Sequence, residues 1–441
     1  MNITGEGTLP SAFDVTGLAV TALSEAASAV ALLAQRHGAE SPEITVNRDL
    51  ASLWFAGSFT PLGWELPPVW DAIAGDYRCL DGWIRLHTNA PHHRAAVLKV
   101  LGLEGDVSRE EVMAAVVLWE GQALEDAVVA ANGCAALLRS PQEWREHPQG
   151  RAVASEPLIG WGDPRAVLAL QDGEASAQRP LAGVRVLDLT RIIAGPVATR
   201  FLAFYGAEVL RIDPPCWDEP SLEAELTIGK RCARLDLKSA AGLVELHELL
   251  AGADIFIHGY RADALDALGL SDAELAARYP SLINVALNAY GWSGQWANRR
   301  GFDSLVQMSC GIAYAGRAYF AQGGGLEDLS ELKPHPLPVQ ALDHATGYLC
   351  AAAAVTAWGE RLEGTVRNAR LSLARTAVEL MGSEPSDPDA PAPHVDGSLL
   401  LAEDTVWGPG QRLPSAVQIT GVVSETDIPA QGLGWAEPHW L

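Results

Sequence analysis

The sequence has few basic residues, no long apolar run and no recognisable leader. Its 31 lysines and arginines face 55 aspartates and glutamates, a net charge of −24, so no overall positive field exists to attract nucleic acid or an anionic membrane surface. No stretch approaches about 18 consecutive apolar residues, which argues against a membrane-spanning helix. The opening segment, MNITGEGTLPSAFDV, lacks the basic and apolar parts of a signal peptide, so we expect a cytoplasmic protein.

Cysteine is also scarce, and its spacing excludes a disulfide scaffold or a CxxC metal site. The six cysteines are Cys79, Cys134, Cys216, Cys232, Cys310 and Cys350. A chain of 441 residues needs no covalent staples, so we expect free thiols that are mostly buried. Cys310, in QMSCGIAYAG, is either a nucleophile or a packed core residue, and packing is favoured.

The common chemical motifs are missing as well. No GxGxxG follows a strand, and GxxxxGK[ST], HExxH and GxSxG are absent. The glycine run at 323–325 is interpreted as a loop, although glycines can approach a phosphate closely. His87, His92 and His93 cluster in HTNAPHH, but a metal site would need further ligands at suitable spacing. We therefore expect a surface loop and no metal.

The length of the chain suits two domains, and the first is predicted over residues 1–165. Residues 14–36 form an Ala- and Leu-rich pattern typical of a helix. DGWIRLHT alternates apolar and polar residues like a half-exposed strand. A helix is predicted to end at Gly102, and Ser108 with Glu111 forms a capping-box pattern. These features indicate a helix-rich α+β domain.

A change of pattern follows a polar linker at 166–180. From 181 to 441, apolar strands such as VRVLDLT, AEVLRID and DIFIHG alternate with helical segments over short connections. Strands that are apolar throughout are typical of a parallel sheet covered on both faces. The sequence thus predicts an α/β protein with a Rossmann-like domain, whose ligands would lie at the carboxyl ends of the strands.

The helical segment 343–364 is similar to that at 14–36, and each is followed by a strand-like and then a helical segment. This similarity is either an internal repeat or a coincidence of two Ala-rich helices, and both interpretations stay open.

Several segments, which follow one another in the same order as in the family, resemble the class III CoA-transferase (CaiB/BaiF) family over roughly 181–380. They are PLAGVRVLDLTRIIAGPVATRFLAFYGAEVLRIDPP, IGKRCARLDLKSAAG, ADIFIHGYRADALDALGL and LPVQALDHATGYLC. In the first 165 residues, DGWIRLHTNAPHHRAAVLKVLG and SPQEWREHPQGRAVA are similar to that family's small domain. Here the small domain precedes the catalytic part, as though the chain were permuted.

The resemblance implies an enzyme that moves CoA between an acyl-CoA and a free carboxylic acid, with CoA as substrate and no tightly bound cofactor. Asp343 stands where the family has its catalytic Asp, which forms covalent aspartyl intermediates. The sequence places it between an expected strand, PVQAL, and a helix, where backbone N–H groups could steady charge. An ordinary Asp N-cap is the alternative. Asp303 is interpreted as a cap or structural contact. The family also implies an interlocked homodimer.

For CoA, the resemblance points to Ile192, Ile193, Ala194, Ala264 and Arg300, and further candidate phosphate contacts are Arg191, Lys230 and Arg231. A solvated surface role is the alternative for each basic residue. Pro214 and Ala267 replace two basic positions of some members.

Two other functions stay open. A racemase of this family would need a second proton carrier where this chain has Phe302. The permuted order leaves room for a non-catalytic acyl-CoA-binding protein.

Overall fold

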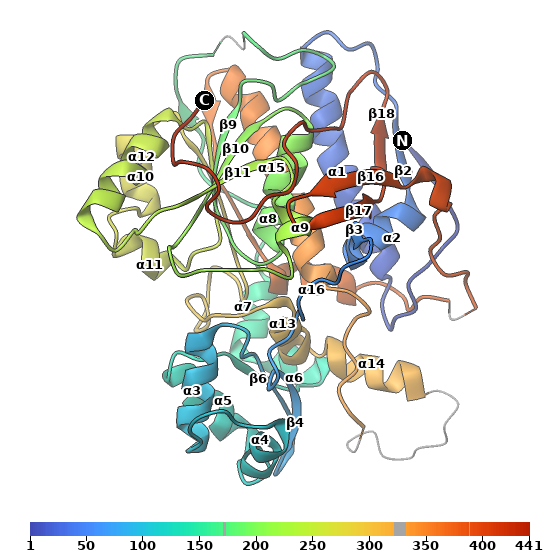
Figure 1. The fold of residues 1–441 in the computed structure, drawn as a ribbon, viewed down its shortest axis with the longest axis vertical. Coiled ribbons are helices and arrows are strands. Elements are labelled where there is room, and N and C mark those ends of the chain that lie inside the picture. Colours follow the sequence, from blue (N-terminus) through green and yellow to red (C-terminus); the bar gives the residue numbers. More distant parts are fainter. Residues whose placement is uncertain (171–172, 322–331, 388) are drawn as a thin grey trace.

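The structure is a computed structural model that describes residues 1–170, 173–321, 332–387 and 389–441. The glycine run at 323–325 lies outside the described residues. Two bodies are visible in Figure 1, a larger upper part built on a sheet and a smaller lower part.

A seven-stranded sheet forms the centre of the larger part. Its order is β11(Lys230–Arg234), β10(Glu208–Asp213), β9(Arg185–Leu189), β12(Ile255–His258), β13(Ile283–Asn288), β15(Ala369–Ser372) and β7(Gly160–Trp161). The first six strands are parallel and β7 is antiparallel at the edge. Numbered along the chain, the six parallel strands have the doubly wound order 3-2-1-4-5-6. The predicted Rossmann-like α/β fold is confirmed.

Helices cover both faces of this sheet because its strands are apolar on both faces. Leu187 and Phe256 point to α10(Ala240–Gly252) and α12(Asp272–Arg278), while Val186 and Ile255 point to the opposite core. That second core contains α8(Ala194–Phe204), α15(Ala341–Leu362) and α1(Val15–Arg36). Figure 1 shows α10 and α12 on one side and α8, α15 and α1 on the other.

The N-terminal residues belong to the larger part, so the structure draws the domain boundary elsewhere than 165. Helix α1, β2(Ile44–Asn47) and α2(Arg48–Ala56) share one continuous core with α8 and α15. Strand β2 lies between β1(Asn2–Thr4) and β18(Val417–Ile419), which joins the two ends of the chain. Similarly, β3(Phe59–Pro61) pairs with β17(Gly408–Arg412), which pairs with β16(Leu401–Thr405). Tertiary pairing of this kind leaves no local signature in the sequence.

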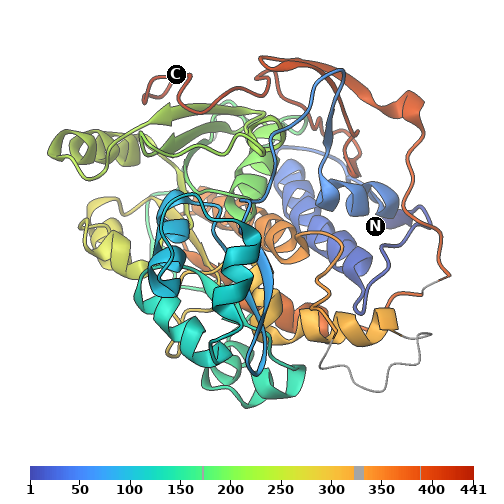
Figure 2. The same ribbon diagram turned by 60° about the horizontal axis from the view of Figure 1, so that its bottom comes forward.

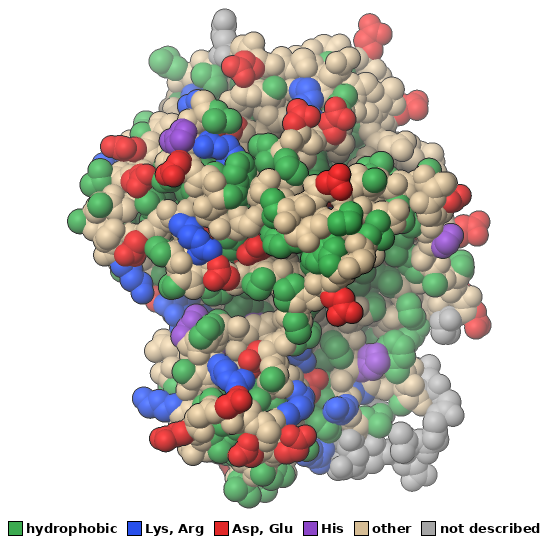
Figure 3. Space-filling model, viewed as in Figure 1, with side chains coloured by type: hydrophobic (Ala, Val, Ile, Leu, Met, Phe, Trp, Pro, Cys, Tyr) green, Lys and Arg blue, Asp and Glu red, His purple; other side chains and the backbone are tan. Residues whose placement is uncertain are grey.

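The smaller part is a separate α+β unit with its own core. It contains the antiparallel sheet β4(Gly75–Cys79), β5(Gly82–Leu86) and β6(Ala135–Leu137), covered by α3(Pro91–Leu101), α4(Arg109–Val116) and α5(Gly121–Ala130). The expected strand, the helix end at left-handed Gly102 and the capping box at Ser108 are all present. This helix-rich second unit confirms the rest of the predicted fold class. It comes forward in Figure 2, and Figure 3 shows the molecule narrowing where it meets the larger part.

Short elements connect the two bodies. They are α6(Pro141–Glu146), α7(Pro148–Ala154), α13(Asp303–Cys310), α14(Ile312–Ala321) and α16(Leu373–Met381). The predicted linker is partly ordered in a sheet, because β8(Arg165–Ala166) pairs with β14(Thr365–Val366).

Helix α1 has the length and mean hydropathy, 1.7, of a membrane-spanning helix. However, 61% of its most apolar window is buried inside the structure, and it packs along α15. These contacts are those of a helix in a protein core.

Candidate active site

The turn after β9 begins the site, and its backbone is held in an uncommon conformation. Ile192 has a φ of 66°, in the left-handed region that a β-branched residue rarely adopts. Its N–H donates to the Glu219 carboxylate at 2.7 Å, which compensates for part of that cost. Helix α8 starts two residues later with no side-chain cap. The turn therefore presents the N-terminus of α8 at the carboxyl edge of the sheet.

Asp343 lies in the first turn of α15, on the same side. The expected strand PVQAL is absent, and residues 336–340 form an irregular approach to the helix. Asp303, the first residue of α13, accepts hydrogen bonds from the N–H groups of Leu342 and Asp343 at 2.9 and 3.0 Å. Asp303 is thus a cap, as expected, but it caps α15 rather than its own helix.

The N–H groups of α15 are consequently not available to a substrate. Besides the two bonds to Asp303, Ala341 donates to the Val339 carbonyl and His344 to the Gln340 carbonyl. The expectation that this helix terminus steadies developing charge is therefore corrected. The N-terminus of α8 is the alternative, because no acceptor for the N–H groups of Ala194 and Gly195 is found within the residues that the structure describes.

Close approach of α8 and α15 brings this terminus to Asp343. A Cβ atom at Gly347 would lie 2.4 Å from the Ala194 carbonyl oxygen and 2.9 Å from Cβ of Val197. Only glycine fits at that crossing unless one of the two helices shifts.

The two carboxyl groups share a buried environment that disfavours ionising both. Burial, followed by the charge of Asp303, raises the pKa of Asp343 well above its ordinary value. Burial raises the pKa of Asp303 to about 6, although hydrogen bonds from Gln307 and from the two N–H groups act in the opposite direction. The Asp343 side chain has no hydrogen bond or ion pair among the described residues. It lines the cavity, so its oxygens are available to a ligand there.

A cavity of about 300 Å³ lies in front of Asp343. Its walls come from the segments after β9, β12 and β13, and from α3 of the smaller unit. The order of the strands reverses between β9 and β12, which is the place where doubly wound sheets bind ligands. Residues from the larger part that line it include Thr190, Gly259, Tyr260, Asn288, Phe302 and Leu373.

The structure brings most predicted site residues to this one cavity. Those in its walls are Asp343, Ile192, Ala194, Ala264, Arg191 and Arg300. Arg191 donates to the Tyr260 hydroxyl and stacks on Trp217, with 4.9 Å from its guanidinium carbon to the ring centroid. Arg300 donates to the Asn132 side chain at 3.2 Å. Ile193, the N-cap residue of α8, is not in the walls.

Two predicted phosphate contacts, Lys230 and Arg231, require correction because both side chains already donate hydrogen bonds within the protein. The Lys230 ammonium is fully buried and donates to Asp188 at 3.2 Å and to the Pro196 carbonyl at 2.8 Å. Burial lowers its pKa to about 8. Arg231 donates to the carbonyl of His439 at 2.5 Å and so holds the C-terminal segment against β11. Neither side chain lines the cavity.

The sequence interpretation missed the contribution of the smaller unit. His92 and His93, assigned to a surface loop, are the second and third residues of α3 and line the cavity. Phe302 stacks on His87 with 3.8 Å between ring centroids. No local pattern could have indicated this, because these histidines meet residues about two hundred positions away only after folding.

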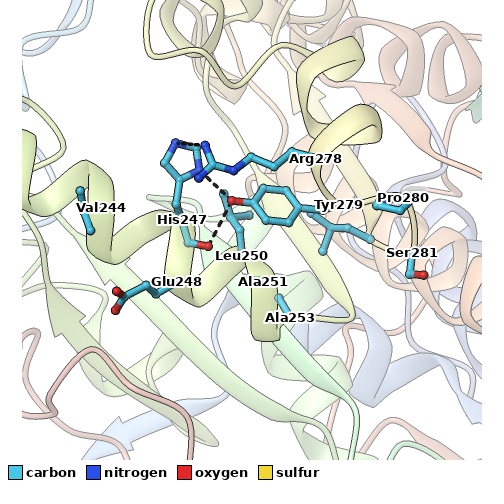
Figure 4. Close-up of a pocket in the computed structure, with 11 residues that line it drawn as sticks. Val244, His247, Glu248, Leu250, Ala251, Ala253, Arg278, Tyr279, Pro280 and Ser281 are labelled. Carbon is cyan, nitrogen blue, oxygen red and sulfur yellow. Dashed lines mark hydrogen bonds between the residues drawn. The ribbon is translucent and has the colours of Figure 1, made fainter.

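Another groove is remote from this chemistry. Figure 4 shows it between α10 and α12, where the Tyr279 hydroxyl lies 2.7 Å from Nδ1 of His247. Its walls precede β12 and β13, at the amino edge of the sheet. Among the described residues of this groove, none has a buried carboxyl group like that of Asp343.

Comparisons with known proteins show which family and which proteins this chain is similar to. Residues 181–397 match the CoA-transferase family III. The chain is 30% identical over 267 residues to an acyl-CoA transferase of Gibberella moniliformis, covering 55% of this chain and 46% of that protein. It is 31% identical over 222 residues to the (R)-2-hydroxy-4-methylpentanoate CoA-transferase of Clostridioides difficile, covering 46% and 53%.

The chain thus spans about half the length of these two curated relatives. Among solved structures, the crystal structure of Rv3272 from M. tuberculosis is 27% identical, with a TM-score of 0.39, covering 46% of this chain and 58% of that one. The part of the chain at 181–397, which contains Asp343 and most of the cavity walls, is therefore assigned to the CoA-transferase family III.

Proposed function

We propose that the protein transfers CoA from an acyl-CoA to a free carboxylic acid, with Asp343 as the covalent nucleophile. The observation that carries this proposal is the Asp343 carboxyl, 7% exposed and without a bonded partner among the described residues, at a cavity with Arg191 and Arg300 in its walls. A carboxylate suits the reaction because its anhydride and thioester are reactive enough to pass CoA on.

The first half of the reaction exchanges the donor acid for CoA on Asp343. A carboxylate oxygen of Asp343 attacks the thioester carbonyl carbon, the C–S bond breaks, and CoA leaves as a thiolate. A mixed anhydride of the donor acid and Asp343 remains. The thiolate then attacks the Asp343 carbonyl carbon, which releases the donor as a carboxylate and leaves an aspartyl-CoA thioester. In both steps the negative charge moves to an oxygen for which the N–H groups of Ala194 and Gly195 are the candidate donors.

The second half reverses these steps with the acceptor. The acceptor carboxylate attacks the aspartyl thioester, the thiolate leaves again, and it then attacks the acceptor carbonyl of the new anhydride. The product is a new acyl-CoA, and Asp343 is restored as a carboxylate. No water is consumed, so a buried cavity that excludes water protects both anhydrides from hydrolysis.

Trapping the intermediate tests the assignment. After incubation with an acyl-CoA, hydroxylamine or borohydride should leave a mass change on the peptide that contains Asp343. Cys310 is the useful internal comparison, because burial raises the pKa of its thiol to about 12 and leaves almost no thiolate. A modified Asp303 or Cys310, or no modified residue in an active preparation, would refute the proposal.

A racemase of the same family is the second candidate. Phe302 offers no second proton carrier, but His93 lies in the same cavity wall, 5.8 Å from Phe302 between ring centroids. Burial lowers the pKa of His93 to about 4, so its imidazole is neutral at pH 7. Exchange of the α-hydrogen of an acyl-CoA in D2O, without transfer of CoA, would favour this activity.

The acyl and acceptor groups are proposed only as a class. The names of the relatives include a branched 2-hydroxy acid, and a transferase of Chloroflexus aurantiacus is named for succinyl-CoA and L-malate. We therefore propose short carboxylic acids, because the cavity of about 300 Å³ must also hold part of CoA. Competition among candidate acids for CoA from one donor would rank them.

We also propose a homodimer, on the resemblance to the family. The long Ala-rich helices α1 and α15 pack on each other within one chain, so they give no support for a dimer. Sedimentation as a monomer at micromolar concentration would contradict the dimer.

A further inference from the structure

The smaller unit supplies one wall of the cavity through the first turn of α3. Pro91, His92 and His93 begin this helix, and its N-cap residue Ala90 makes no side-chain hydrogen bond. The His92 side chain is exposed, while His93 is 3% exposed, and their ring centroids lie 4.1 Å apart. The uncapped helix terminus and two histidines thus meet the carboxyl edge of the large sheet.

The groups that face His92 are cations. Burial, followed by the positive charges of Arg300, Arg191 and Lys238, lowers the pKa of His92. These three side chains come from the segments after β13, β9 and β11 respectively. On its own helix, the ring beside it is His93.

These three cations lack the carboxylate partners that several arginines elsewhere in the structure have. Arg299, next in sequence to Arg300, lies 2.8 Å from Glu125, and Arg211 lies 2.8 Å from both Asp213 and Glu219. By contrast, no carboxylate lies within ion-pair distance of Arg191, Lys238 or Arg300 among the described residues. In a chain with a net charge of −24, such a cluster indicates an anionic ligand.

The orphaned groups of His93 point to the same place. Neither of its ring nitrogens has a hydrogen-bond partner among the described residues, although the side chain is almost fully buried in the cavity wall. An unsatisfied buried polar group costs free energy, so a ligand or water that reaches it is favoured.

We propose that His92 is a phosphate contact of CoA and that it takes up a proton when CoA binds. This inference rests on the proposed function, because CoA supplies the phosphates. In the free protein the surrounding cations disfavour an imidazolium. A bound phosphate reverses the local field and accepts a hydrogen bond from the protonated ring, so the pKa of His92 is higher in the complex. Affinity for CoA is therefore greatest at low pH and falls as pH rises through the pKa of the complex.

Calorimetry in two buffers with different ionisation enthalpies measures the proton uptake directly. At pH 7 we expect the wild-type protein to take up a fraction of a proton with CoA, and H92Q to take up less. Between pH 6 and pH 8 the wild-type affinity should fall by about five- to tenfold more than that of H92Q. The phosphate monoester of CoA itself titrates near pH 6, and comparing the two proteins with the same ligand cancels that contribution.

A lysine variant separates charge from structure. H92K carries a fixed positive charge, so it should keep wild-type affinity at pH 6 and lose the extra weakening at pH 8. H394Q, at an exposed histidine outside the cavity wall, is the matched control and should behave as wild type.

The outcomes distinguish the two proposals. If the wild-type protein does not bind CoA at all, the proposed function fails. If it binds CoA with the same proton uptake as H92Q, or if H92K binds more weakly than H92Q, the role of His92 is overturned while the proposed function stands.

Discussion

Apart from the two-residue strand β14, residues 341–381 build the same three elements in the same order as residues 15–56, and only this second set faces the cavity. Each is a 22-residue helix, a four-residue strand and a nine-residue helix. The second helix is capped in both by a side chain, Asn47 or Ser372, that accepts from the N–H three residues on. Each strand lies between one parallel and one antiparallel neighbour. The repeat suggested by the sequence is therefore structural as well as compositional.

The two units differ at the start of their long helices. The Asp14 carboxylate accepts a hydrogen bond from the N–H of Gly17 at 2.7 Å and thus caps α1. Asp343 is the third residue of α15, after the N-cap residue Gln340, and Asp303 from α13 accepts from the first N–H groups of that helix instead. An outside cap leaves the carboxyl of Asp343 free for chemistry. The comparison teaches that the local pattern specifies the unit, while a distant residue decides whether its acid is structural or reactive.

The largest expected difference between the units is in activity. Asp343→Asn keeps the shape of the side chain and removes the nucleophile, so turnover should fall by about three orders of magnitude or more while CoA still binds. Asp14→Ala removes a cap and should cost only about 1 kcal/mol of stability. Steady-state kinetics and urea unfolding of both variants measure this. Equal losses of activity in the two would contradict the division of roles.

Glycine at the helix crossing gives the next largest difference. The Cβ of Gly347→Ala would meet the Ala194 carbonyl oxygen and Cβ of Val197, which cannot turn away. We expect a loss of about 1–3 kcal/mol and a fall in activity, because α15 must shift.

The matched control is the glycine in the first helix. The Cβ of Gly17→Ala would meet the end of the Asp14 side chain, 2.0 Å from its Oδ2, and that carboxyl can rotate. A weakened cap and the better helix propensity of alanine should then nearly cancel. Thermal unfolding separates the two variants, and a Gly17→Ala as unstable as Gly347→Ala would show that the close α8–α15 contact is not special.

The pair of carboxyl groups of Asp343 and Asp303 has no counterpart in the first unit. It should set the pH dependence of activity. Activity requires ionised Asp343, whose pKa burial and Asp303 raise, so the rate should climb with pH through that raised pKa. Asp303→Asn keeps a carbonyl oxygen for the two N–H groups and removes the like charge. The acidic limb of kcat/KM should therefore move to lower pH.

The same two carboxyl groups should make stability depend on pH in the opposite direction to activity. Both pKa values are raised in the folded state, so the folded protein binds more protons than the unfolded chain above about pH 4. Its stability therefore falls as pH rises from about 4 through the raised values. Asp343→Asn should be stabilising relative to wild type at pH 8 and not at pH 3, as urea unfolding at the two pH values would show. An unchanged difference would mean that folding does not raise the pKa of Asp343.

Much of this architecture follows from local sequence, and the rest depends on tertiary contacts. Apolar strands with short connections predicted the parallel sheet, and Gly102 and Ser108 marked helix ends correctly. Asp343 was identified by resemblance, since its position alone favoured an ordinary N-cap. Lys230 was a candidate phosphate contact in a segment that resembles the family, but its ammonium is buried and donates to Asp188. The cavity wall at His92 and the outside cap at Asp303 exist only after segments far apart in sequence meet.

The smallest expected difference is in stability, and here the larger loss is expected in the first unit, which does not face the cavity. In both, a buried hydroxyl joins the long helix to the short one: Thr16 and Ser52 lie 2.9 Å apart, and Thr346 and Thr376 lie 2.7 Å apart. Thr16 also accepts from the N–H of Leu9 at 3.0 Å, so Thr16→Val leaves two groups unsatisfied. After Thr346→Val, the hydroxyl of Thr376 can still donate to the Ser372 carbonyl at 3.3 Å.

We therefore expect a loss of about 2 kcal/mol for Thr16→Val and about 1 kcal/mol for Thr346→Val, because each unsatisfied buried group adds its own desolvation cost. Urea unfolding of the two variants measures the difference. Thr376→Val and Ser52→Ala complete a double-mutant cycle in each unit and isolate the hydroxyl pair from the bond to Leu9. If Thr346→Val costs as much as Thr16→Val, the N-terminal segment before α1 contributes nothing through Thr16.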